Sequence, residues 1–255
     1  MESSIIDNPA PTILIVDDQI DNIQVLAIAL EMQGYSITYA LSGIETFQRL
    51  NAIKPDIILL DLFMPGMDGL QVCEQLKADA NYQDIPILFL TASHDEDHII
   101  NAFEKGAADY VTKPFRTIEL FARVKTHIQL RRQALEIDRN RNKLETIVNH
   151  IQDGILLVDR NGVIKFANST SAQMFDKTLS SLVGSQIGIP IVDRRITQIN
   201  IIKPNGELGQ AEITVAQTEW DDEPASIICL RDVSDLDLRR SHGISNHRDT
   251  ENTEE

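Results

Sequence analysis

Residues 55–69 read PDIILLDLFMPGMDG and place a carboxylate, Asp61, directly after a short apolar run. The run at residues 57–60 is apolar at every position, which is typical of a strand covered on both faces in a parallel sheet. Proline and glycine residues then break the chain. Because ligands of open parallel sheets bind beyond the carboxyl ends of the strands, Asp61 is predicted to be a functional residue at the rim of a sheet.

The pattern around this stretch alternates strands with helices from Pro11 to about Arg116. Strands are expected at residues 12–16, 36–40, 55–60, 85–90 and 107–111, and helices at residues 19–33, 42–53, 70–77 and 95–105. Five such units predict an α/β domain with a doubly wound, five-stranded parallel sheet. The flavodoxin-like strand order 2-1-3-4-5 would make the first and third strands neighbours.

Polar side chains stand at the expected ends of these strands. Asp17 and Asp18 follow the first strand, Asp61 the third, Thr91 the fourth and Lys113 the fifth. In the order 2-1-3-4-5 the three carboxylates crowd one crevice, where like charges disfavour joint ionisation. A hard divalent cation relieves that repulsion, and Mg2+ is the natural candidate because it binds carboxylates together with phosphate oxygens.

Each of these residues also has an ordinary structural explanation. Asp17 alone could be a turn residue or a helix cap, Thr91 a cap, Lys113 a solvated lysine and Tyr110 a half-buried strand aromatic. The acids and the lysine together, each at a strand end, favour the functional interpretation instead.

The same residues resemble the receiver domain of two-component response regulators. The resemblance spans about residues 11–130 and rests on Asp17-Asp18, on Asp61 with MPGMDG at residues 64–69, on Thr91-Ala92 and on Lys113-Pro114. It implies that Asp61 is the phosphoacceptor of a partner histidine kinase or phosphotransfer protein.

The resemblance also implies roles for the surrounding residues. Mg2+ would be held by Asp17, Asp18, Asp61 and the backbone carbonyl of Phe63. Lys113 and Thr91 would contact the phosphoryl oxygens, Thr91 and Tyr110 would form the switch, and the Lys113-Pro114 bond would be cis. No other cofactor is expected.

A long helix without proline or glycine is expected from Phe115 to His150. Apolar residues recur every seventh position, at Leu130, Ile137, Leu144 and Ile151, with Ala134, Arg141 and Val148 at the intermediate positions. The pattern predicts a parallel coiled coil and a homodimer formed through residues 123–151 and the following domain. The basic residues of this helix are interpreted as its solvated face, because no aromatic residues are interleaved with them.

The second half of the chain has short strands. Residues 155–158 and 163–166 flank the turn DRNG, and further strands are expected at residues 199–203, 212–217 and 226–231. The stretches IQDGILLVDRNGVIKFAN and IICLRDVSD resemble a PAS domain, an α+β fold. Such domains sense ligands or dimerise; the flavin cysteine motif is absent, so no bound chromophore is expected.

The chain is expected to comprise an N-terminal tail at residues 1–10, a receiver domain at 11–122, a helical linker at 123–147, a PAS-like domain at 148–236 and a disordered tail at 237–255. A net charge of -16 disfavours nucleic acid and anionic membranes as partners. Two distant cysteines and no long apolar run predict a cytoplasmic protein without membrane contact.

These features predict a phosphorylation-switched response regulator that acts through an unknown downstream protein and is not an enzyme beyond self-phosphorylation and autodephosphorylation. A PAS-based sensor of small ligands with the receiver as secondary input is the alternative, as is a regulatory fragment of a larger hybrid kinase or cyclase. A metal-dependent phosphatase is disfavoured because Phe63 stands where such enzymes have a second acid.

Overall fold

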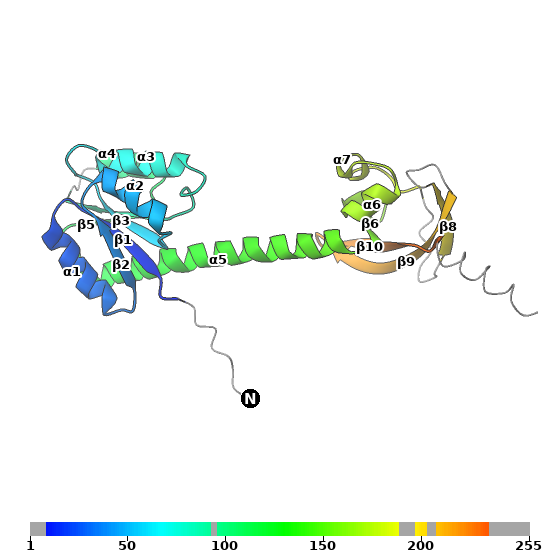
Figure 1. Ribbon diagram of the computed structural model, residues 1–255, viewed down its shortest axis with the longest axis horizontal. Helices are drawn as coiled ribbons and strands as arrows, with labels where there is room; N and C mark the ends of the chain where they lie inside the picture. Colours follow the sequence, from blue (N-terminus) through cyan, green and yellow to red (C-terminus); the bar gives the residue numbers. More distant parts are fainter. Residues whose placement is uncertain (1–8, 93–95, 189–196, 203–207, 235–255) are drawn as a thin grey trace, which may run out of the picture. The chain divides into compact units, whose positions relative to one another are not determined.

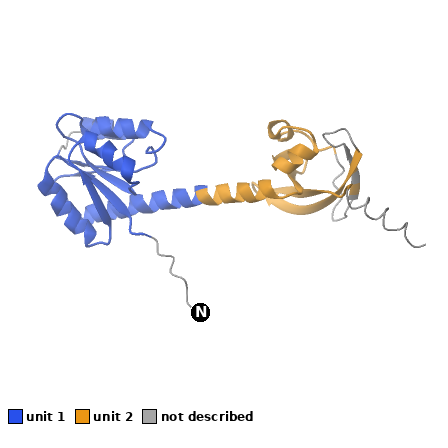
Figure 2. Ribbon diagram, in the orientation of Figure 1, with its two compact units in different colours: residues 1–138 blue, residues 139–255 orange. Residues whose placement is uncertain are grey.

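The computed structural model describes residues 9–92, 96–188, 197–202 and 208–234. The chain divides into two compact units, residues 1–138 and residues 139–255 (Figure 2). Most of the predicted N-terminal tail, the last residue of the strand expected at 199–203 and the predicted C-terminal tail lie outside the described residues. Among the described residues, no helix combines the length and the apolar character needed to cross a bilayer.

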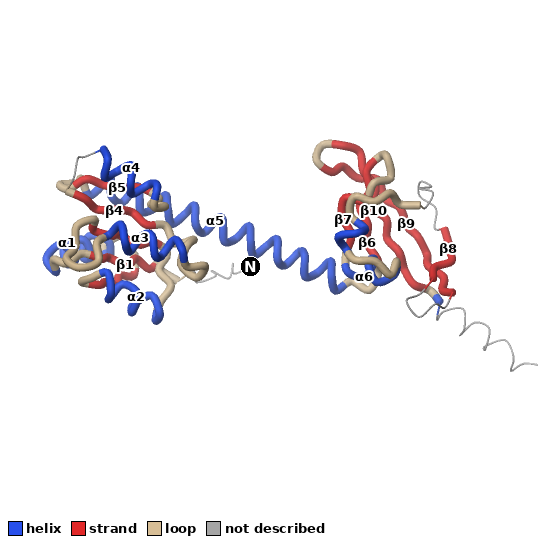
Figure 3. The backbone as a smooth tube through the Cα atoms, turned by 90° about the horizontal axis from the view of Figure 1, so that it is seen from above, coloured by secondary structure: helices blue, strands red, loops and turns tan. Residues whose placement is uncertain are grey.

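The first unit is built on a parallel sheet with the order β2-β1-β3-β4-β5 (Figures 1 and 3), which confirms the predicted fold. Its strands are β1 (Thr12–Val16), β2 (Ser36–Ala40), β3 (Ile57–Asp61), β4 (Ile87–Thr91) and β5 (Asp109–Thr112). Its helices are α1 (Ile20–Glu31), α2 (Gly43–Ala52), α3 (Gly69–Ala78), α4 (Glu96–Glu104) and α5 (Thr117–His150).

Helices cover the sheet on both faces because successive strand residues point to opposite sides. In β3, Ile58 and Leu60 pack in the cluster that includes α2, α3 and α4, while Ile57 and Leu59 pack with α1 and the beginning of α5. All four side chains are fully buried. The uniformly apolar run of the sequence therefore lies at the centre of the sheet, and Asp61 is the residue that ends the strand.

An ion pair anchors the beginning of α5 to β5. Both carboxylate oxygens of Asp109 accept hydrogen bonds of 2.7 Å from Arg123, and His127 Nε2 lies 3.3 Å from one of them. Burial of Asp109 would raise its pKa, but the hydrogen bonds from Arg123, the Tyr110 backbone and His127 outweigh burial and lower it.

This ion pair makes a pH-dependent contribution to stability. Since the pKa of Asp109 is lowered in the folded state, its contribution is present above the unfolded value and is lost as the pH falls through the folded value. We expect urea unfolding to show Asp109→Asn less stable than wild type at pH 7, with a difference that shrinks as the pH falls through the lowered pKa of Asp109. The exposed carboxylate variant Asp21→Asn serves as control. A difference that stays constant across the acidic range would contradict this origin.

The second unit is an antiparallel sheet with the order β7-β6-β10-β9-β8, as expected for a PAS-like fold. Its strands are β6 (Gly154–Asp159), β7 (Ile164–Ala167), β8 (Thr197–Ile202), β9 (Leu208–Trp220) and β10 (Glu223–Asp232), and its short helices are α6 (Ser169–Met174) and α7 (Leu179–Leu182). Asp159 accepts hydrogen bonds from the backbone of Asn161 and Val163, which forms the predicted hairpin turn. Trp220 lies at the tip of the β9–β10 hairpin, half exposed rather than in the core.

The buried side chain of Asn168 ties the end of α5 to this sheet. Its Oδ1 accepts hydrogen bonds from the backbone of Ile155 and Ser171, and its Nδ2 donates to the carbonyls of Val148 and Asp153. One amide therefore caps the C-terminal end of α5 and the N-terminal end of α6. The last turn of α5 is therefore hydrogen-bonded to the second unit and belongs to it.

Candidate functional site

Three carboxylates meet at the carboxyl end of the central strands of the first unit. Asp17 follows β1 directly, Asp61 ends β3, and these two strands are neighbours. One oxygen of each of Asp17, Asp18 and Asp61 lies within 4.8 Å of the others. Asp17 and Asp61 are buried, whereas Asp18 is exposed. The structure thus brings the three predicted acids together at the topological switch point of the sheet.

Lys113 supplies the positive charge of this cluster. It follows β5, and its Nζ lies 2.9 Å from Asp17 Oδ2 and 2.9 Å from Asp61 Oδ1. Burial would lower the pKa of Lys113, but the two carboxylates raise it, so the ammonium group stays charged. Burial raises the pKa of Asp61 even though Lys113 opposes this effect. Asp61 is therefore a poorly solvated carboxylate beside a fixed cation, and a second cation would favour its ionised form.

Thr91 and Tyr110 lie on β4 and β5, the two strands that follow β3 in the sheet. Thr91 ends β4, is buried, and lines a small cavity together with Tyr110. The Tyr110 ring packs edge-on against Phe103 with the ring centroids 5.9 Å apart. Phe63 is exposed and its ring lies edge-on to that of His98. The Lys113-Pro114 bond is cis.

The sequence did not single out Asn22, which holds Asp17 in place. The Asn22 Nδ2 lies 3.0 Å from Asp17 Oδ1 and 3.1 Å from Oδ2, and the backbone of Gln19 also donates to Oδ1. Asn22 is in the first turn of α1, five residues beyond Asp17. The sequence signal that could have identified Asn22 is an amide side chain five residues after the acidic residue that follows a strand.

We expect Asn22→Ala to weaken Mg2+ binding roughly tenfold, because residues that orient a metal ligand typically contribute that much to affinity. Isothermal titration calorimetry with Mg2+ measures the change. Gln24→Ala, which removes an exposed amide from the same helix, is the matched control. Equal affinities for wild type and Asn22→Ala would show that Asp17 needs no such support.

Comparison with protein families finds matches in both units. The family "Response regulator receiver domain" matches residues 13–125, and the family "PAS domain" matches residues 142–212. The first match contains all the predicted site residues, and the second begins on α5 and extends into β9.

Curated relatives resemble about half of the chain. Residues of this chain are 47% identical over 118 residues to the phosphate regulon transcriptional regulatory protein PhoB of Pseudomonas aeruginosa, a match that covers 45% of this chain and 50% of that protein. The DNA-binding dual master transcriptional regulator RpaA of Synechocystis sp. is 43% identical over 115 residues, covering 45% and 48%. The chain therefore spans about half the length of these relatives.

Among solved structures, the signal receiver domain of a signal transduction histidine kinase from Syntrophus aciditrophicus is 34% identical. The match covers 47% of this chain and 91% of that one, with a TM-score of 0.45.

Proposed function

We propose that this chain, in which a response regulator receiver domain precedes a PAS domain, accepts a phosphoryl group on Asp61 from a partner histidine kinase or phosphotransfer protein. The observation that carries the proposal is the arrangement of Asp17, Asp18 and Asp61 around one point, with Lys113 Nζ bonded to two of them. Such a site binds a transferring phosphoryl group through opposite charges on either side of it.

The chemistry assigns one task to each residue. A carboxylate oxygen of Asp61 attacks phosphorus, the new P–O bond forms as the P–N bond to the donor histidine breaks, and the imidazole leaves. Lys113 and the hydroxyl of Thr91 donate hydrogen bonds to the phosphoryl oxygens. The donor set suits Mg2+, which Asp17, Asp18, Asp61 and the backbone carbonyl of Phe63 would hold and which would neutralise phosphoryl charge.

Incubation with acetyl phosphate and Mg2+, followed by intact mass measurement, tests the proposal. We expect wild type to gain one phosphoryl group and Asp61→Asn to gain none. The matched control is Asp56→Asn, in the residue that directly precedes β3. Uptake by Asp61→Asn, or none by wild type, would refute Asp61 as the acceptor.

Thr91 and Tyr110 are the proposed switch residues. A shift from mostly off to mostly on requires about 5.5 kcal/mol, whereas one hydrogen bond to a charged group contributes roughly 1.5 to 3 kcal/mol. Thr91, Lys113 and the metal must therefore act together. Hydrogen exchange over residues 96–125 of the same samples should change on phosphorylation; unchanged protection in wild type would contradict this switch.

The output is proposed to pass to a downstream protein through a homodimer formed by residues 123–151 and the PAS domain. The chain would then be a phosphoacceptor rather than an enzyme. The names of the two curated relatives describe regulators of transcription, one of them DNA-binding, but only about half of each relative is matched. The absence of nucleic-acid contact remains our prediction for this chain. Light scattering after phosphorylation tests the dimer.

A further inference from the structure

The middle of α5 has no cover among the described residues. Every residue from 133 to 147 is exposed, on all sides of the helix. Four apolar residues along one side are more than half exposed: Leu130 (55%), Ile137 (70%), Leu144 (64%) and Ile147 (59%). A helix of this length without packing is marginally stable in water, since helices derive most of their stability from an apolar face that is buried.

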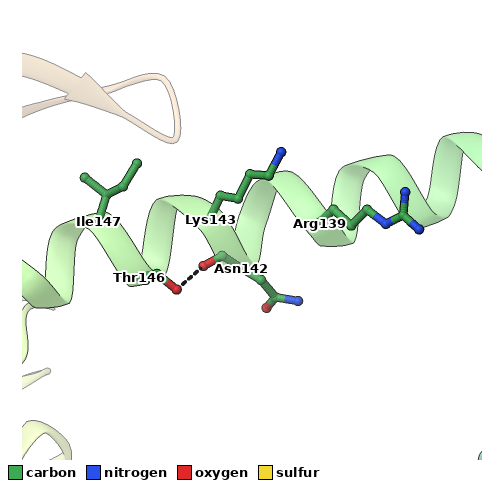
Figure 4. Close-up of a pocket in the computed structure, with 5 residues that line it drawn as sticks. All are labelled: Arg139, Asn142, Lys143, Thr146 and Ile147. Carbon is green, nitrogen blue, oxygen red and sulfur yellow. Dashed lines mark hydrogen bonds between the residues drawn. The ribbon is translucent and has the colours of Figure 1, made fainter. Parts of the chain in front are cut away.

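Two apolar seams are available on this helix, and both contain Leu130, Ile137 and Leu144. One passes through Ala134, Arg141 and Val148, and the other through Gln133, Asn140 and Ile147. The structure distinguishes them at the end of the helix. Val148 is half-buried, and Asn168 binds its carbonyl, whereas Ile147 is exposed. Figure 4 shows Ile147 and Lys143 on one side of the helix, with Asn142 and Thr146 on the other.

We propose that a second copy of this chain packs in parallel against the face formed by Leu130, Gln133, Ile137, Asn140, Leu144 and Ile147. This inference rests on the proposed homodimer and specifies its surface, in place of the seam through Arg141 and Val148 that the sequence suggested. Asn140 then lies opposite Asn140 of the partner subunit. A polar pair in an apolar seam fixes the register of a coiled coil.

Charge complementarity supports both the parallel orientation and this seam. Glu136 and Arg141 flank the seam at positions where, in a parallel pair, Glu136 of one helix faces Arg141 of the partner subunit. Arg141 already donates a hydrogen bond of 3.0 Å to Glu145 of its own helix. It can pair with this carboxylate and with that of Glu136 of the partner subunit at the same time. An antiparallel pair would not bring Glu136 to Arg141. In the other seam the flanking positions pair Gln133 with Asp138 and Asn140 with Glu145, which offers no opposite charges.

Disulfide cross-linking tests the seam in the full chain. The background is Cys229→Ser; Cys73 is retained because it is buried and burial raises the pKa of its thiol to about 11. We expect Ile147→Cys and Asn140→Cys to cross-link under mild oxidation at least about tenfold faster than the controls Val148→Cys and Ala134→Cys, which lie in the other seam. Light scattering of the reduced background protein, before and after phosphorylation with acetyl phosphate and Mg2+, measures its mass independently.

Each result decides between the proposals. If the mass is that of a dimer but the control variants cross-link faster, the proposed seam is wrong and the dimer is supported. If the mass is that of a dimer and no variant cross-links, the parallel orientation is wrong. A monomeric mass overturns the dimer and the seam together. As a second measurement, Glu136→Arg should weaken the dimer about fivefold, and Glu136→Arg with Arg141→Glu should recover part of the loss. No weakening by Glu136→Arg would contradict the parallel charge pairing.

Discussion

Replacing Gly69 by alanine is expected to destabilise the receiver unit by about 3 kcal/mol and to abolish phosphoryl uptake by Asp61. Gly69 is the first residue of α3, and its backbone N–H donates to the carbonyl of Leu62. A Cβ there would clash with the carbonyl oxygen of Asp61 and would lie 2.9 Å from Phe89 Cε1 and 3.0 Å from the Cα of Leu62. Two of these neighbours are backbone atoms that cannot rotate away, so Asp61, the proposed phosphoacceptor, would be displaced.

Gly66 provides the matched control in the same loop. A Cβ at Gly66 meets nothing within 4 Å, and only its positive φ of 81° opposes a side chain. Gly66→Ala should therefore lose about 1 kcal/mol and still accept phosphate. Urea unfolding followed by circular dichroism measures both variants, while fluorescence of Trp220, the single tryptophan, follows the second unit. Equal losses for the two variants would contradict the steric account.

Replacing Lys113 by alanine is expected to lower metal-free stability by about 2 kcal/mol and to increase the stabilisation that Mg2+ provides. The Lys113 ammonium group compensates two buried carboxylates, Asp17 and Asp61, and both lose that partner in the variant. The remaining acids gain more from a divalent cation than they do in wild type. The expected loss of stability is smaller than the loss on breaking a fully buried ion pair, because the lysine side chain is 24% exposed.

Thermal unfolding with and without Mg2+ measures the effect. Lys105→Ala is the matched control, because Lys105 pairs at 2.6 Å with the exposed carboxylate of Glu74 far from the acids. That variant should lose under about 1 kcal/mol and should show the wild-type response to Mg2+. If Lys113→Ala were as stable as wild type in the absence of metal, the repulsion between the carboxylates would not lower the stability of the fold.

The sequence predicted what depends on local periodicity and on strand direction. Parallel strands place their carboxyl ends at one edge, so Asp61, Thr91 and Lys113 could be assigned to a common rim once five strands were recognised. Asn22 could not be assigned in the same way, because its contact with Asp17 depends on the angle at which α1 leaves β1. The roles of the site residues stay predictions.

The seam of α5 shows a second limit of sequence reasoning. A heptad pattern gives equal weight to Ile147 and Val148, since both lie at permissible positions after Leu144. The structure separates them: Val148 is half-buried and its carbonyl accepts a hydrogen bond from Asn168, twenty residues further on, whereas Ile147 is exposed. The helix α7 was not predicted for a related reason: four residues carry too little periodicity to identify.

Because part of α5 is uncovered, the rate at which a protease digests the protein should depend on the protein concentration. Arg139, Arg141 and Lys143 are trypsin cleavage points within the stretch of α5, residues 133–147, in which every residue is exposed. In dilute solution this stretch would open and be nicked, which would cut the chain between the two units. At higher concentration a bound second copy would protect it, so the rate of digestion at a fixed enzyme ratio would fall as the protein becomes more concentrated.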